Sequence, residues 1–166
     1  MKKCLLIILV MLLVFTGCGK KEEKDAEKDK VTTGQTETES KMVCTLSNVT
    51  SDYTLNATYT IYYEGKYVDY VHSVENLKSD DTTVLNTIYD FTLSSYKKMK
   101  DNYGGYDFNV NKTGNTVVSD IKIYYSRMDL QRYVNDNPTL RQYVENDKML
   151  VDGVKSLYTQ VGAKCN

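Results

Sequence analysis

Hydrophobic and polar side chains alternate in several stretches between residues 42 and 166, and this alternation predicts β-strands. Over residues 53–63 nearly every second side chain is apolar, with Thr and Asn mostly between them, as is typical of a half-buried strand. The turn Glu64-Gly65-Lys66 leads into a second alternating stretch, residues 67–74, so we expect a hairpin. Three further stretches are predicted to be strands: 43–47, 106–111 and 116–125.

Apolar residues at helical spacing predict the helices. Ser79 is suited to cap the first helix, with Asp80 and Asp81 in its first turn, and Gly104-Gly105 is expected to end it. The order ββ-α-ββ-α indicates an α+β domain in which a small antiparallel sheet of two hairpins packs against helices. Three shorter helices are expected: one over 127–134, one beginning at Pro138, and one over 147–161 that Gly162 ends.

The N-terminal pattern differs from that of the domain. Lys2 and Lys3 precede twelve uncharged, mostly aliphatic residues, 4–15, whose helix would be roughly 18 Å long and too short for a bilayer core of roughly 30 Å. Such a segment is typical of a signal peptide. Residues 19–41 carry six Lys and seven Asp or Glu and almost no large apolar residue, so we expect a tether of roughly 26 Å root-mean-square length.

The segment Thr16-Gly17-Cys18 resembles the lipobox of bacterial lipoproteins, although Phe15 stands where Leu is usual. The resemblance implies that residues 1–17 are a signal peptide and that Cys18 carries a diacylglycerol group. The chain would then be held at the outer face of the cytoplasmic membrane, more in the manner of Gram-positive bacteria, with residues 18–41 as tether and 42–166 as one domain. The alternatives are a secretory signal cut elsewhere, giving a secreted protein, or an anchor helix with Cys18 unmodified.

Two cysteines, Cys44 and Cys165, lie at opposite ends of the expected domain. In an exported protein such a pair favours a disulfide, here enclosing 121 residues (165 minus 44), worth up to roughly 4–5 kcal/mol from loop entropy. The alternative is two separate thiols. No CxxC motif or neighbouring histidine favours a redox or metal role for either cysteine.

Three segments together resemble the YehR-like lipoproteins of the bacterial envelope: TIYYEGKYVDYVHSVE, GYDFNVNKTGNTVVSDIKIYYSRMDLQRY and VKSLYTQVGAKC. The likeness covers nearly all of residues 42–166. It implies the same fold and a lipoprotein signal. It implies no catalytic or ligand-binding residue, because the domain of that family has no assigned function.

Candidate chemistry is sparse. Residues 42–166 carry 13 Lys or Arg against 15 Asp or Glu without a basic cluster, so nucleic acid is not an expected partner. His72, the one histidine, is expected to be partly buried on the second arm of the first hairpin, in phase with Val68, Tyr70 and Val74. The acidic pairs Asp80-Asp81 and Asp136 with Asp147 are interpreted as caps, turns and solvated surface rather than acid/base pairs or calcium ligands. We expect no enzyme, no cofactor and no metal site.

Tyrosine is the unusual feature of the composition, with fifteen Tyr and no Trp. We expect some to form the core, and Tyr62, Tyr70 and Tyr124 are candidates for an exposed binding surface, since tyrosine combines apolar area with a polar tip. The alternative is that they only shield an open sheet. The leading hypothesis is a membrane-anchored binding or accessory domain for an envelope protein, peptide or glycan. A carboxylate-dependent envelope hydrolase and an assembly factor of a membrane complex are the alternatives, and the oligomeric state is left open.

Overall fold

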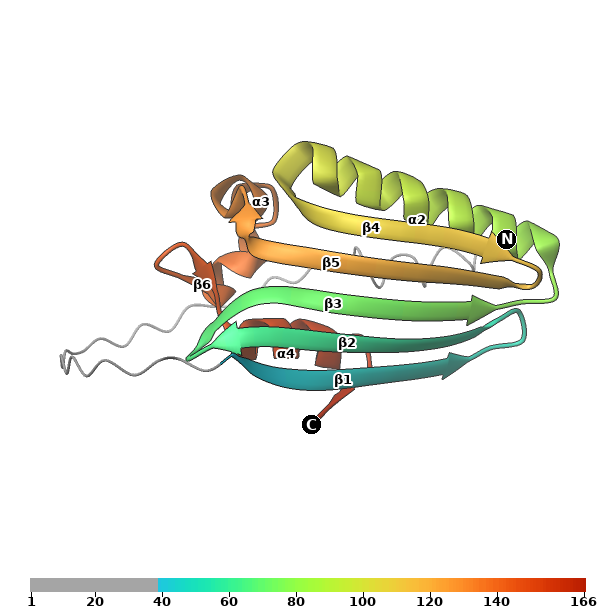
Figure 1. Cartoon of the computed structure of the whole chain (residues 1–166), viewed down its shortest axis with the longest axis horizontal. Coiled ribbons are helices and arrows are strands. Elements are labelled where there is room, and N and C mark those ends of the chain that lie inside the picture. The colour runs from blue at the N-terminus through green and yellow to red at the C-terminus, as the bar shows by residue number, and fades with distance from the viewer. Residues whose placement is uncertain (1–38) are drawn as a thin grey trace.

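Six strands form one antiparallel sheet in the computed structural model, which describes residues 39–166 (Figure 1). The order across the sheet is β4-β5-β3-β2-β1-β8, so the predicted hairpins β2–β3 and β4–β5 join through β3 and β5. This confirms the expected α+β class, and β1 and β8 widen the sheet beyond the two hairpins. The strands are β1 (Ser40–Val49), β2 (Thr54–Glu64), β3 (Tyr67–Lys78), β4 (Gly104–Thr113), β5 (Thr116–Met128) and β8 (Lys164–Cys165).

The helices cover one face of this sheet. In Figure 1, α4 (Val151–Gln160) lies behind β2 and β1, α2 (Thr82–Tyr103) runs along the edge of the sheet above β4 and partly behind it, and the opposite, open face is turned toward the viewer. Between β5 and α4 the chain forms α3 (Leu130–Asp136), the 3-10 helix η1 (Pro138–Tyr143) and a small hairpin of β6 (Val144–Glu145) and β7 (Lys148–Met149). Within residues 39–166, none of the helices combines the length and hydropathy needed to span a bilayer.

The core follows from the alternation along the strands. Side chains such as Ile61, Val71 and Ile121 point to the covered face and are fully buried. Ile61 and Val71 belong to a cluster that Leu140, Met149 and Val154 complete from the helical side. A second cluster forms where α2 packs over the other end of the sheet: Tyr53, Leu77, Leu85, Val110 and Val117.

Asp81, rather than the predicted Ser79, caps α2. The Asp81 carboxylate accepts hydrogen bonds from the backbone N–H groups of Thr83 and Val84, so Asp80 and Asp81 precede the helix instead of filling its first turn. Ser79 is buried and donates its hydroxyl to the carbonyl of Asp52 at 2.5 Å. The serine therefore joins the loop before β2 to the end of β3, and the capping role moves two residues along the chain.

The final helix begins later than predicted, at Val151 instead of residue 147. Asn146 and Asp147 have positive φ of 51° and 57° and form the two-residue turn between β6 and β7. Asn and Asp tolerate this left-handed conformation better than most residues, and tight hairpin turns require it. A local hairpin thus replaces the expected first turn of the helix.

One further boundary and one face assignment were also wrong. Arg127 and Met128 extend β5, and α3 starts only at Leu130 because the side chain of Asp129 caps it by accepting from the N–H of Arg132. In β3, a register shift opposite Tyr62 and Tyr63 breaks the alternation, so Val68 is buried instead of lying in phase with His72. The strands 43–47, 67–74 and 106–111 were placed correctly but are longer in the structure.

The predicted disulfide joins the two ends of the domain. Cys44 on β1 and Cys165 on β8 lie directly opposite one another in antiparallel register and are bonded. The N–H of Asn166 also donates to the carbonyl of Val43 at 3.0 Å. Ser40 and Lys41, expected as the last tether residues, already pair with β2.

Candidate functional site

The open face of the sheet carries its aromatic side chains in one cross-strand row. Lys41 on β1, Tyr62 on β2, Tyr70 on β3 and Tyr124 on β5 lie opposite one another in register. We call Tyr62, Tyr70 and Tyr124 the tyrosine ladder. The rows further along the face instead carry Val43, Thr60, His72 and Lys122, then Thr45, Thr58, Val74 and Asp120, then Ser47, Asn56, Asn76 and Val118.

The rings of the ladder stack on each other. The ring centroids of Tyr62 and Tyr70 are 4.3 Å apart with planes 11° from parallel, and those of Tyr70 and Tyr124 are 5.3 Å apart at 30°. The guanidinium carbon of Arg127 lies 4.0 Å from the centroid of Tyr124 and covers its other face. Because side chains of strand residues stand roughly perpendicular to the sheet, the stacked rings present edges and hydroxyls, not faces, to the solvent. A sugar ring would find no open ring face at Tyr70.

Polar contacts surround the ladder. Burial raises the pKa of Tyr70, and the neighbouring Tyr62 and the carboxylate of Glu39 raise it further. In the next row the Nε2 atom of His72 lies 2.8 Å from an oxygen of Asp120. The hydroxyl of Ser126 donates to Asp69 at 2.9 Å. The groups near the ladder are therefore largely engaged with one another, and the ladder is an aromatic row at one end of an otherwise polar face.

The structure brings together all three predicted surface tyrosines, each half-buried. His72 is partly buried, as predicted, with 29% of its side chain exposed. Sequence reasoning missed Arg127, because residue 127 was placed in a helix instead of at the end of β5. Extending the strand 116–125 by two residues would have placed Arg127 in β5. Strict alternation would still have put it in phase with Val117, on the covered face, so no local pattern indicated its contact with Tyr124.

A buried carboxyl group lies on the covered face of the same sheet. Glu75 on β3 is 6% exposed, and its Oε1 atom has no hydrogen-bond partner among residues 39–166. Burial raises the pKa of Glu75 to about 7, although a hydrogen bond with Tyr59 works in the opposite direction. The pKa values of Tyr59, Tyr96 and Tyr158, on β2, α2 and α4, are raised mainly by burial and also by this carboxyl group. The sequence carried a signal for this burial, because Glu75 is in phase with buried Val71 along β3.

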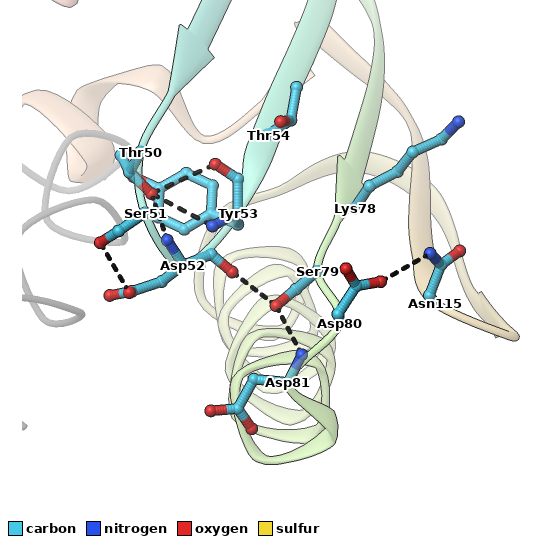
Figure 2. Close-up of a pocket in the computed structure, with 10 residues that line it drawn as sticks. All are labelled: Thr50, Ser51, Asp52, Tyr53, Thr54, Lys78, Ser79, Asp80, Asp81 and Asn115. Carbon is cyan, nitrogen blue, oxygen red and sulfur yellow. Dashed lines mark hydrogen bonds between the residues drawn. The ribbon is translucent and has the colours of Figure 1, made fainter.

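A polar hollow of about 540 Å³ opens at the far end of the sheet from the ladder, between the β1–β2 loop and the start of α2 (Figure 2). Three aspartates line it, but Figure 2 shows their carboxylates turned away from one another. Asp52 accepts from Ser51, Asp80 accepts from Asn115, and Asp81 caps α2. Such satisfied, diverging carboxylates do not form an acid/base pair.

The remaining candidate carboxylates are also separate. Asp136 accepts a hydrogen bond from the hydroxyl of Tyr103 at 2.9 Å, and Asp147 accepts one from Gln131 at 2.7 Å. Among residues 39–166, no three His, Cys, Asp or Glu side chains are grouped so that they could hold a metal ion. The predicted lipidation site, Cys18, and the signal peptide lie outside the described residues.

Comparison with one solved structure supports the fold. The NMR structure of the YehR protein of E. coli aligns with a TM-score of 0.51 and 15% sequence identity, covering 79% of this chain and 93% of that chain. The NMR structure of a protein from Streptococcus pneumoniae TIGR4 aligns with a TM-score of 0.46 and 12% identity, covering 90% of this chain and all of that chain. No protein-family model and no curated protein sequence matches this chain. The domain therefore has a YehR-like fold, which says nothing of its ligand.

Proposed function

We propose that this chain is a lipid-anchored binding protein of the bacterial envelope, attached through Cys18 and using the tyrosine ladder as its binding surface. One observation carries the proposal. Three tyrosines from three strands, up to 62 residues apart in the sequence (124 minus 62), meet in a single row on the face of the sheet that no helix covers.

The physical properties of the ladder suit binding. Tyrosine offers a large amphipathic surface, and the stack holds the rings in fixed positions, so little side-chain freedom is lost when a partner docks. Arg127 and Lys41 end the row with cations, and Tyr and Arg are among the residues enriched at protein interfaces.

The alternatives find less support. A carboxylate-dependent hydrolase needs two acidic groups that converge on a substrate, and the aspartates of the hollow diverge. An assembly factor with a broad apolar docking face is not favoured either, since the large hydrophobic side chain exposed in residues 39–166 is Val49, at the end of β1.

The anchor is tested with Cys18→Ser in the full chain. We expect the variant to lose both the lipid-modified N-terminus, detected by mass spectrometry, and retention in the membrane fraction. Retention of an acyl-free protein in membranes would refute the lipid assignment.

The ladder is tested separately, with binding of the acyl-free Cys18→Ser chain to isolated envelopes of the producing cells. Adding Tyr62→Ser, Tyr70→Ser and Tyr124→Ser should reduce saturable binding at least tenfold. The matched control changes Asn56 and Asn76 to Ser, three rows away on the same face. Equal binding by the ladder variant and this control would remove the ladder from the proposal.

A further inference from the structure

We infer that the tyrosine ladder rests on the lipid headgroup region of the same membrane that holds the anchor. The inference deepens the proposed function and rests on it, because it takes Cys18 as the lipidated residue. It names the bilayer surface as the partner of the ladder, in place of an envelope protein or glycan.

The position of the ladder is the first argument. The chain coming from Cys18 enters the domain at β1, and the ladder row begins at Lys41, the second residue of that strand. Glu39 follows Cys18 by only 21 positions (39 minus 18), a reach of at most roughly 75 Å for a fully extended chain. Val49, at the other end of β1, is eight residues beyond Lys41 (49 minus 41) and so lies roughly 27 Å further along the same face. The ladder is thus at the end of the open face where the described chain enters the sheet, at the start of β1 (Figure 1).

The chemistry of the ladder is the second argument. Tyrosine is enriched where hydrocarbon meets headgroups, because the ring is apolar and the hydroxyl hydrogen-bonds to water and phosphate. Rings standing on edge present such hydroxyl tips together, with ring edges between them. The same arrangement leaves no open ring face at Tyr70, the centre of the ladder, because the rings of Tyr62 and Tyr124 lie on either side of it.

The charges around the ladder are balanced. The cations Lys41, Lys122 and Arg127 border the row, and so do the carboxylates Glu39, Asp69 and Asp120. The attraction therefore depends on the tyrosines and on single cation–phosphate contacts rather than on net charge, and added salt should weaken it little.

A weak contact is sufficient in this geometry. An anchored domain meets its own membrane at an effective concentration on the order of millimolar, so a contact of millimolar affinity is already substantially populated. The same three tyrosines in an acyl-free protein would bind vesicles or envelopes only at protein concentrations on the order of millimolar, and the acyl-free chain is titrated against envelopes in that range. The experiment on the ladder and the bilayer uses the lipidated chain, in which the contact is populated.

The chain has no tryptophan, so one substitution introduces a unique fluorophore. The lipidated protein carrying Tyr70→Trp is reconstituted in vesicles of phosphatidylglycerol and brominated phosphatidylcholine, whose bromine atoms quench only nearby indoles. The matched control is Val49→Trp, since Val49 is 71% exposed on the same face at the far end of β1. A second ladder variant, Tyr62→Trp, covers the case that position 70 does not tolerate the larger ring.

We expect the ladder tryptophan to lose most of its emission relative to unbrominated vesicles and the control tryptophan to lose little. Equal quenching at both positions, or none at either ladder position, would overturn the inference. Flotation of the vesicles and the mass of the N-terminal peptide are measured in the same samples. Flotation of the lipidated protein without ladder quenching would leave the anchor intact and point to an envelope protein or glycan instead. An unmodified Cys18 would refute the proposed anchor itself.

Discussion

Replacing the buried carboxyl group of Glu75 by the amide of Gln is expected to make the protein more stable at pH 8 and to leave its stability nearly unchanged at pH 4.5. Burial raises the pKa of Glu75 from its ordinary value of 4.5 to about 7. At pH 8 the folded protein must therefore hold a carboxylate in the core, with Oε1 unpaired. Gln has nearly the same shape and stays neutral at both pH values.

The magnitude follows from linkage between protonation and folding. A group whose pKa is higher in the folded than in the unfolded state contributes stability that is present at low pH and is lost as pH rises through the folded pKa. The difference between a pKa of 4.5 and one of about 7 corresponds to roughly 3 kcal/mol, at about 1.4 kcal/mol for each pKa unit. The loss should develop between about pH 4.5 and pH 7.5.

Urea unfolding followed by circular dichroism, at pH values from 4.5 to 8, measures this directly. Glu145→Gln is the matched control. Glu145 is exposed, and its hydrogen bond with Lys66 lowers its pKa, so its contribution to stability has the opposite pH dependence. Glu75→Gln should gain on the wild type as pH rises, whereas Glu145→Gln should not. A stability difference for Glu75→Gln that is the same at both pH values, or a variant less stable at pH 8, would refute the reasoning.

Three further predictions concern the covalent and local features of the fold, each measured by urea unfolding. Replacing both Cys44 and Cys165 by Ser should cost about 2–5 kcal/mol, because the bond encloses 121 residues of the unfolded chain. Gly153→Ala should cost about 1–3 kcal/mol despite the better helix propensity of Ala, because a Cβ would come within 3.0 Å of three carbon atoms of Tyr143. Asp81→Ala should cost about 1 kcal/mol by removing the cap of α2.

Each of these has a control on the same chain. Reduction of the wild-type protein should reproduce the effect of the double cysteine variant, and equal stability of oxidised and reduced protein would contradict the first prediction. Gly114→Ala is the control for Gly153→Ala. Gly114 has φ of 56° but open space around it, so any cost of this substitution reflects backbone conformation alone. Asp80→Ala is the control for Asp81→Ala. It should lower the free energy of unfolding less than Asp81→Ala does, because Asp80 contacts Asn115 and does not cap the helix.

The local elements could be predicted from the sequence because each depends on neighbouring residues. The alternation over 53–63 predicts β2 and its buried face, and the apolar stripe ending at Gly104 predicts α2. Errors occurred where a single side chain decided a boundary. Asp81, and not Ser79, caps the N-terminus of α2. Asn146 and Asp147 form a tight turn where the start of a helix was expected.

The candidate site could be predicted only in part. Alternation placed Tyr62, Tyr70 and Tyr124 on exposed faces of their own strands, but it contains no information on which strands are neighbours. The row forms because β3 pairs with β5 in a register that sets Tyr70 opposite Tyr124, 54 residues away (124 minus 70). The burial of Glu75 likewise depends on α2 and α4 packing over β3 from the same side.

The sequence by itself determined the α+β class, the faces of most strands and the residues of the candidate ladder, and it favoured a disulfide between the domain's two cysteines over two separate thiols. These features depend on the spacing of hydrophobic residues along the sequence and on the chemistry of a few residues. Only the tertiary structure decided the strand order, the stacking of the ladder against Arg127, its place beside the entry of the chain, and the unpaired carboxyl group in the core. Those features depend on contacts between residues far apart in the sequence, where packing and register, rather than local periodicity, select the partner.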